Sequence, residues 1–161
     1  MGNPQTIAGV ELLPRKRLDD ERGAILKVWS ASEGIGFEPD AIGEVYLSVV
    51  KPSVVKGWHL HKEMTLRYVC VAGRVLVGLY DNRPTSPTRG MSMKVVLADS
   101  GPDYQMLVVR PGIWNGFRSL TGQAAMVLNV PDMPHDPHEI ERMPPQDAPW
   151  PFDWGGYEYG G

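Results

Sequence analysis

The sequence lacks features that several classes of protein require. It has one cysteine, Cys70, so no disulfide can form within the chain. It has no apolar run of about 18 residues, which argues against a membrane-spanning helix. No signal peptide is recognised, so we expect a cytoplasmic protein. The net charge is −3, and nucleic acid and anionic membranes are therefore not expected partners, although a local cluster of Arg and Lys can still hold an anionic small molecule.

The length and the turn-forming residues indicate the organisation of the chain. A length of 161 residues suits one domain and suffices to bury a core. The 18 glycines and 15 prolines are spread along the chain, as expected for many tight turns between strands. We predict a single domain over residues 1–161, with flexible ends at 1–8 and 155–161.

Short strand-like segments dominate the rest of the pattern. They are rich in Val, Leu, Met and Tyr and are bounded by Gly, Pro, Asn or Asp, which predicts an all-β barrel or sandwich. The predicted strands cover residues 26–30, 42–50, 65–72, 75–80, 92–98, 105–109 and 124–130.

One segment near the C-terminus predicts a helix. Asp136 is followed by Pro137 and then Glu139, which fits an N-cap, a first-turn proline and a capping-box acid. We expect a short helix that continues through Arg142 and ends before the next prolines. The aromatic tail over residues 149–161 is expected to pack across the barrel.

A His-x-His pair is the main candidate for chemistry. Side chains alternate between the two faces of a strand, so His59 and His61 point the same way and Trp58 points the other way. Two imidazoles in one cavity have three interpretations. They can be metal ligands, acid–base groups near neutral pH, or a structural pair satisfied by backbone or water.

The surroundings of the pair argue against a metal site. A metal-binding cupin adds a Glu several residues after the pair and a third His on a later strand. Here the place for the carboxylate is near Leu66, and Asn115 stands where the third His would lie. Two histidines without a well-placed anionic ligand make a poor site for zinc or iron. We therefore expect a pocket without a metal ion or other cofactor.

Five short segments in order resemble the dTDP-4-dehydrorhamnose 3,5-epimerase family, especially a divergent branch from polysaccharide synthesis. The resemblance covers most of the chain, from Gly9 to Trp154. The segments are 20–23 (Asp-Glu-Arg-Gly), 56–59 (Lys-Gly-Trp-His), 86–90 (Ser-Pro-Thr-Arg-Gly), 111–117 (Pro-Gly-Ile-Trp-Asn-Gly-Phe) and 151–154 (Pro-Phe-Asp-Trp).

The resemblance implies a fold, a partner and a reaction. It implies a cupin-type jelly-roll barrel and a homodimer in which N-terminal strands pair across subunits. It implies a nucleoside-diphosphate sugar as substrate and a cofactor-independent epimerisation at carbon 3 or 5 of a 4-keto sugar. His59 falls on the base of the family, and Lys56 and Arg22 fall on arginines that contact phosphate. The enolate formed when the base removes the proton must be stabilised by the enzyme.

The proton donor of that family, a Tyr, has no match, because residues 124–130 contain no Tyr. Tyr68, on the strand after His61, and Tyr46 are the candidate donors, and each has a packed aromatic ring as its plainer interpretation. His61 is a further candidate donor. Asn115 is a candidate for hydrogen bonding to the keto oxygen, with the capping of a turn as its alternative.

Other residues complete the predicted site and leave the function open between alternatives. Arg110, at the predicted barrel mouth, and Trp114 are further candidates for substrate contact, whereas His135 and His138 are interpreted as surface or dimer-contact residues. The first hypothesis is epimerisation of a nucleotide-linked 4-keto-6-deoxy sugar for polysaccharide synthesis. The alternatives are a keto-isomerase of the same substrates and a non-catalytic barrel that binds a nucleotide sugar.

Overall fold

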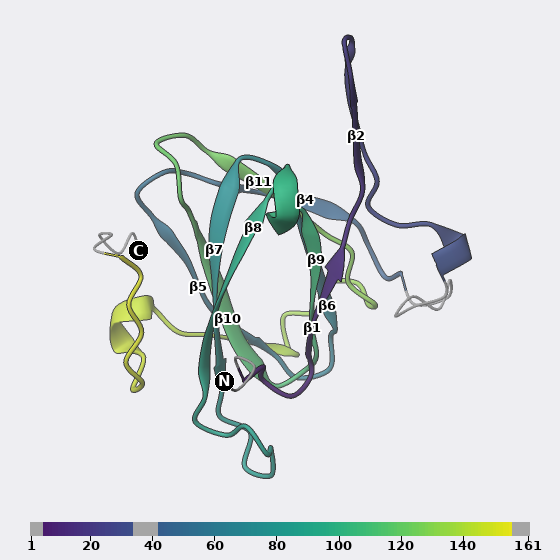
Figure 1. Ribbon diagram of the computed structural model, residues 1–161. Coiled ribbons are helices and arrows are strands. Elements are labelled where there is room, and N and C mark those ends of the chain that lie inside the picture. The colour runs from purple at the N-terminus through teal and green to yellow at the C-terminus, as the bar shows by residue number, and fades with distance from the viewer. Residues whose placement is uncertain (1–4, 34–41, 156–161) are drawn as a thin grey trace.

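The computed structural model describes residues 5–33 and 42–155, and its body consists of two five-stranded antiparallel sheets that face each other (Figure 1). The first sheet has the order β1-β9-β6-β11-β4. Its strands are β1 (Val10–Pro14), β9 (Gln105–Val109), β6 (Leu66–Ala72), β11 (Ala125–Asn129) and β4 (Tyr46–Val50).

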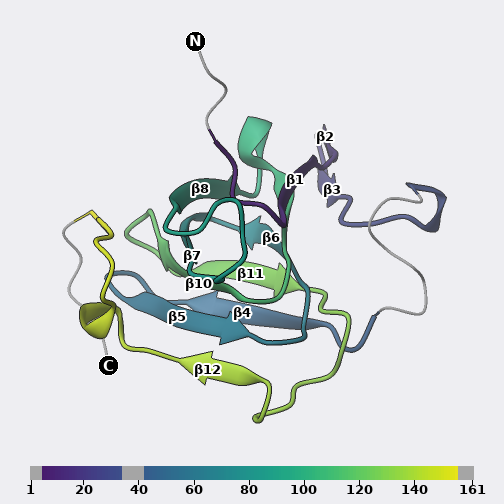
Figure 2. The same cartoon turned by 90° about the horizontal axis from the view of Figure 1, so that it is seen from below.

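The second sheet has the order β12-β5-β10-β7-β8, and Figure 2 shows β12 lying beside β5. Its strands are β12 (Ile140–Arg142), β5 (Val55–His61), β10 (Ile113–Ser119), β7 (Arg74–Asp81) and β8 (Ser92–Ala98). The prediction of an all-β fold is confirmed. No strand pairing joins the two five-stranded sheets within the described residues, so a closed barrel stays a prediction.

The main core lies between the two sheets. Alternate residues of each strand point inward, as the two-residue period of a strand requires. Leu66 and Cys70 of β6 meet Val77 and Leu79 of β7 in this core, and all four are at most 1% exposed. The single cysteine is therefore a buried core residue.

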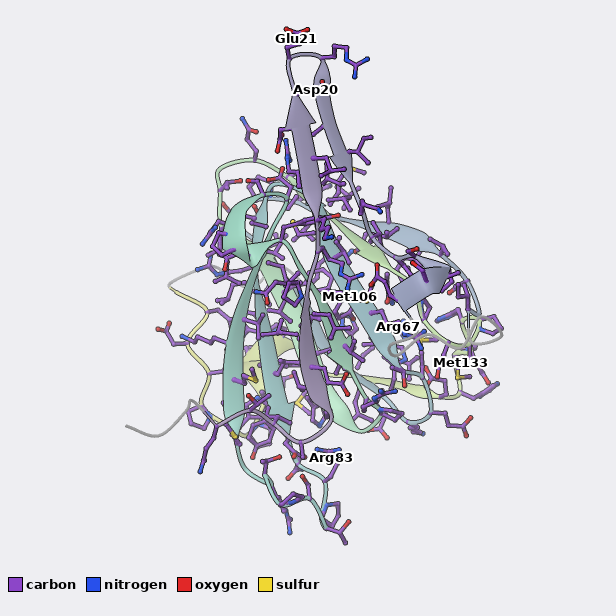
Figure 3. All side chains as sticks on the ribbon, turned by 45° about the vertical axis from the view of Figure 1, so that its right-hand side comes forward. Asp20, Glu21, Arg67, Arg83, Met106 and Met133 are labelled. Atoms are coloured by element: carbon purple, nitrogen blue, oxygen red, sulfur yellow. The ribbon has the colours of Figure 1, made fainter. Side chains whose placement is uncertain are left out.

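A hairpin of β2 (Arg17–Asp20) and β3 (Gly23–Leu26) projects from this body (Figure 1). Figure 3 labels Asp20 and Glu21 at its tip, at the far end of the molecule from Arg83. Leu18 is 53% exposed and Ile25 is 64% exposed, so the hairpin presents apolar side chains to solvent in the single chain.

The aromatic tail packs on the outer face of the second sheet, as predicted. Trp58 is fully buried there and its ring lies 5.4 Å from Trp150 and 5.1 Å from Trp154, measured between centroids. The backbone of Gly78 makes room for this tail, because a Cβ atom at Gly78 would lie 2.6 Å from atoms of Phe152 and Trp154. The tail therefore closes a second apolar layer outside the sheet.

The predicted C-terminal helix is wrong. The segment after Asp136 turns and then forms β12, which pairs with β5 in the register Ile140↔His61 and Arg142↔His59. Within the described residues the only helices are three-residue 3-10 turns: η1 (Ala31–Glu33), η3 (Gly101–Asp103) and η4 (Pro145–Asp147). Pairing along the free edge of β5 outweighs the local capping pattern, since an N-cap contributes only about 1 kcal/mol.

The remaining boundaries differ in detail from those expected. β3 ends at Leu26, where a strand over residues 26–30 was predicted, because β3 pairs with β2 instead. Residues 1–4 and 156–161 of the predicted flexible ends lie outside the described residues. Ile7, by contrast, is 1% exposed in the core, and the N–H of Ala8 donates to the Thr88 hydroxyl at 3.0 Å.

Candidate functional site

A cavity of about 320 Å³ opens between the two sheets at the end where β4 and β5 meet the segment that carries β12. Strands from both sheets line it, so side chains of the first sheet face side chains of the second across it. The lining residues are Glu44, Tyr46, Ser48, Lys56, His59, His61, Met64, Tyr68, Phe117, His135, Ile140 and Arg142. A cavity of this volume lies in the range of small-molecule sites.

Strand β5 carries three of the polar groups that line this cavity. His59 and His61 share one face, as the alternation predicted, while Trp58 points to the outer aromatic layer. Lys56 is three residues before His59 and would face the other way on a regular strand. A register shift against β10, where His59 pairs with Asn115 and Gly57 pairs with Gly116, brings Lys56 back to the cavity face.

The histidine deeper in the wall, His61, forms a buried pair with Glu139. The Nδ1 of His61 is hydrogen bonded to Oε1 of Glu139, while Oε2 accepts the backbone N–H groups of Glu63 and Met64, each at 3.2 Å. Burial raises the pKa of Glu139, but the hydrogen bonds from His61 and the two backbone groups outweigh it and leave the pKa below its usual value. The carboxylate thus fixes the ring orientation of His61 and leaves its Nε2 for another partner.

His59 lies nearer the cavity mouth and is held as a neutral imidazole. Burial is the main cause that lowers its pKa from 6.5 to about 4, and the electrostatic effects of Arg142, His61 and Lys56 lower it further. A hydrogen bond with the Asn115 backbone opposes this shift. At neutral pH the ring is therefore unprotonated and able to accept a proton.

Two tyrosines reach the cavity from the first sheet, and their hydroxyls differ in environment. Tyr68 is 5% exposed and its hydroxyl donates to Oδ1 of Asn115 at 2.9 Å. Burial raises the pKa of Tyr68 well above its usual value, and the nearby Tyr46 adds to this rise. Tyr46 is 41% exposed, and its hydroxyl oxygen accepts a hydrogen bond from Nδ2 of Asn129 at 2.9 Å.

Asn115 acts within the protein rather than in the cavity. Its side chain is fully buried and is not part of the cavity lining. Oδ1 accepts the Tyr68 hydroxyl, and Nδ2 donates to the carbonyls of His59 at 3.3 Å and Ile113 at 3.4 Å. In the single chain the Asn115 amide is therefore engaged within the protein, and its contact with a keto oxygen stays a prediction.

Two cations line the cavity, and only one was predicted. Nζ of Lys56 donates to the Ser48 hydroxyl at 2.6 Å, and burial lowers the pKa of Lys56. Arg142 was expected at the end of a helix but is paired with His59 across β12 and β5, which puts both side chains on the cavity face. The sequence signal for Arg142 was hidden because a three-residue edge strand has no periodicity to recognise.

Three predicted substrate contacts lie away from the cavity in the single chain. The side chain of Arg22 is 85% exposed at the hairpin tip and forms an ion pair with Asp20 at 2.6 Å. Arg110 forms an ion pair with Glu11 at 3.6 Å beside β1. Trp114 packs in the outer aromatic layer, because its neighbours on β10 take the inward positions. The roles of Arg22, Arg110 and Trp114 in substrate binding therefore stay predictions.

The cavity wall also contains two residues that were not predicted to belong to the site. His135, interpreted as a surface or dimer-contact residue, lines the cavity together with Glu44, which was not singled out. No group of three or more His, Cys, Asp or Glu residues within 5–33 and 42–155 is placed to hold a metal ion. In the same part of the chain, no helix is long and apolar enough to cross a membrane.

The fold and the cavity define a two-sheet, cupin-like β protein with an imidazole-lined small-molecule site. Comparison with known proteins gives the family. The model of the family described as dTDP-4-dehydrorhamnose 3,5-epimerase matches residues 4–159, and the chain belongs to this family of nucleotide-sugar epimerases. The predicted resemblance is confirmed.

Individual relatives agree with this assignment. The probable low-salt glycan biosynthesis epimerase Agl13 of Haloferax volcanii is 33% identical, over 88% of this chain and 90% of that protein. The spore coat polysaccharide biosynthesis protein SpsL of Bacillus subtilis is 24% identical, over 92% of this chain and 96% of that protein. The crystal structure of a dTDP sugar isomerase from Desulfovibrio desulfuricans G20 has a TM-score of 0.85 at 35% identity, with 94% of each chain covered.

Proposed function

We propose that the protein epimerises carbon 3, carbon 5 or both in a nucleotide-linked 4-keto-6-deoxy sugar, without a metal ion, for the synthesis of a surface polysaccharide. The observation that supports this proposal is the position of two groups across one cavity. His59 comes from the second sheet and Tyr46 comes from the first, and both line the same space. Inversion of a carbon centre needs a base on one face and an acid on the other.

The base in this proposal is His59. The carbon next to a ketone is acidic enough for an imidazole to deprotonate it, provided that the enolate is stabilised. The low pKa of His59, about 4, keeps the ring in its basic form at neutral pH. His61, whose Nδ1 is bonded to Glu139, has Nε2 left for a hydroxyl of the sugar.

The cations provide the counter-charge for the substrate. Lys56 and Arg142 both line the cavity with His59, and each lowers the pKa of that ring, which indicates that their charges act within the cavity. A nucleoside diphosphate is anionic and would be attracted to this pair. The same positive charge favours an enolate over the neutral ketone.

The test is proton exchange with inversion. The protein is incubated with dTDP-, GDP-, CDP- and UDP-linked 4-keto-6-deoxy sugars in deuterated water, and the sugar protons are followed by NMR. Deuterium at carbon 3 or 5 together with the inverted sugar is the expected result. A moved carbonyl would show the keto-isomerase instead, and binding without exchange would show a non-catalytic binding protein.

Two histidine variants test the role of His59, one at the proposed base and one at a control position. His59→Asn should lower exchange by at least about 100-fold, because general-base catalysis contributes on the order of 10²–10⁴. His138→Asn should exchange like the parent, because His138 is exposed and outside the cavity lining. Equal exchange by both variants would remove His59 from the mechanism.

A homodimer is the second part of the proposal, and two exposed apolar surfaces support it. Leu18 and Ile25 on the hairpin are more than half exposed, as are Val45 and Val49 at the free edge of the first sheet. A second copy that covers these side chains would remove apolar area from water. Leu18→Glu with Ile25→Glu should convert a dimer into a monomer in light scattering after gel filtration, whereas a parent that is monomeric at all concentrations would contradict the proposal.

A further inference from the structure

A buried amide on β11 holds the hydroxyl of Tyr46. Asn129 and Tyr46 are directly opposite each other in the β11–β4 pairing, and the Asn129 side chain is fully buried. Its Oδ1 accepts the backbone N–H of Arg67 at 2.9 Å. A backbone N–H can be accepted only by the oxygen of an amide, so the orientation of the Asn129 side chain is fixed. Nδ2 must then be the atom that faces Tyr46, at 2.9 Å from its hydroxyl oxygen.

This orientation decides where the Tyr46 proton points. Nδ2 is a donor only, so the hydroxyl oxygen of Tyr46 is the acceptor in this bond and its own proton is directed elsewhere. Tyr46 lines the cavity and is 41% exposed, so that proton is accessible to a molecule bound there. This arrangement suits a group that gives a proton to a bound molecule.

Tyr68 has the opposite arrangement. Its proton is donated to Oδ1 of Asn115 at 2.9 Å, and the side chain is 5% exposed. The pKa of Tyr68 is raised well above its usual value by burial and by the proximity of Tyr46. The two phenols therefore differ in one respect that matters for proton transfer: one accepts a hydrogen bond from its amide neighbour and the other donates one.

We propose that Asn129 is a positioning residue that makes Tyr46, and not Tyr68, the proton donor of the reaction. This inference rests on the proposed epimerase function. His59 removes the proton next to the ketone, and the electron pair of the C–H bond moves into the enolate. That pair then forms a new C–H bond on the other face as the O–H bond of Tyr46 breaks. The Asn129 amide stabilises the resulting phenolate, and water carries the net proton from His59 back to Tyr46.

The decisive variant is Asn129→Asp, which keeps the size of the side chain and the acceptor for the Arg67 N–H. A carboxylate cannot donate, so it accepts the Tyr46 proton and turns it away from the cavity. In deuterated water this variant should still incorporate deuterium into the sugar, because His59 is intact. Inversion should fall by about tenfold or more relative to exchange in the same sample, in line with the size of general-acid effects.

The ratio of inversion to exchange is the readout, because the fraction of folded protein cancels in it. Tyr46→Phe should show the same uncoupling, and the double variant should be no worse than Tyr46→Phe alone, because Asn129 acts through Tyr46. Asn82→Asp, an exposed amide in the turn after β7, controls for the added charge and should leave the ratio unchanged.

The outcomes separate the inference from the function on which it rests. A parent that exchanges and inverts, combined with Asn129→Asp at the parental ratio, would overturn the role of Asn129 and leave the epimerase in place. Exchange and inversion that fall in equal proportion, or effects of the two variants that multiply, would assign Asn129 a structural role only. A parent that shows no exchange with any of the four nucleotide sugars would overturn both.

Discussion

His61 and Glu139 are 78 residues apart in the chain and hydrogen bonded in the wall of the cavity. Glu139 is 4% exposed and its second carboxylate oxygen accepts two backbone N–H groups, so one side chain joins the turn after β5 to the segment that begins β12. This pair adds a side-chain link to the backbone pairing that holds the three-residue strand β12, and with it Arg142, against β5. Loss of the His61–Glu139 hydrogen bond should therefore lower the stability of the fold and displace Arg142 from the cavity.

Glu139→Ala should lower the free energy of unfolding by about 2–3 kcal/mol, because it leaves two backbone donors and the His61 ring without their acceptor. Glu139→Gln keeps one acceptor oxygen and should cost less. Urea denaturation of the two variants and the parent measures the difference. Equal stability of Glu139→Ala and the parent would show that the carboxylate does not anchor β12.

The acid limb of the pH–rate profile should lie near pH 4. His59 has a pKa of about 4 instead of 6.5, mainly through burial, so the basic form of the ring persists until the pH falls to that region. The same depression means that the contribution of His59 to stability is complete above pH 6.5 and is lost as the pH falls through 4. Deuterium exchange measured from about pH 3 to pH 8 tests this, and an acid limb at pH 6.5 would contradict it.

Arg142→Gln should move that acid limb upward. The Arg142 charge is the largest electrostatic contribution that lowers the pKa of His59, after burial, so removing it raises that pKa. The acid limb of Arg142→Gln should therefore lie at a higher pH than that of the parent. Arg142→Gln should also weaken the binding of a nucleoside diphosphate, measured by calorimetry. Arg89→Gln, an exposed arginine outside the cavity lining, is the control and should change neither quantity.

Tyr68→Phe should keep the parental ratio of inversion to exchange. The Tyr68 hydroxyl donates to Asn115 within the protein and is not directed at a ligand. Its loss leaves a buried amide oxygen without a donor, so the free energy of unfolding should fall by about 1–3 kcal/mol. Thermal unfolding and the NMR assay give the two numbers. Uncoupled exchange in Tyr68→Phe would make Tyr68 the donor in place of Tyr46.

Local patterns in the sequence predicted the parts of the site that belong to one strand. The alternation of side chains correctly placed His59 and His61 on one face and Trp58 on the other. The same alternation would point Lys56 away from the cavity. The register shift opposite Gly116 instead brings Lys56 to the cavity face. The shift depends on the close approach of two glycines, since a Cβ atom at Gly57 would lie 2.8 Å from Cα of Gly116.

Local sequence patterns did not predict the contacts between strands that are distant in the chain. The capping signal at Asp136 was genuine as a local preference, and the Asp136 side chain does accept the N–H of His138 at 2.8 Å. The chain nevertheless forms β12, because the free edge of β5 and the buried Glu139 offer more hydrogen bonds than one helical turn. Arg142 consequently reaches the cavity from a segment that sequence patterns assign to a surface helix.

The sequence by itself determined the all-β class, the placement of His59 and His61 on one face of a strand, and the family to which the chain belongs. These follow from short-range geometry and from motifs that are local in the chain. Only the tertiary structure decided that Tyr46 accepts a hydrogen bond from Asn129 while Tyr68 donates one to Asn115. The reason is physical: the direction of a hydrogen bond is set by which partner already has its donor or acceptor engaged, and those partners come from strands far apart in sequence.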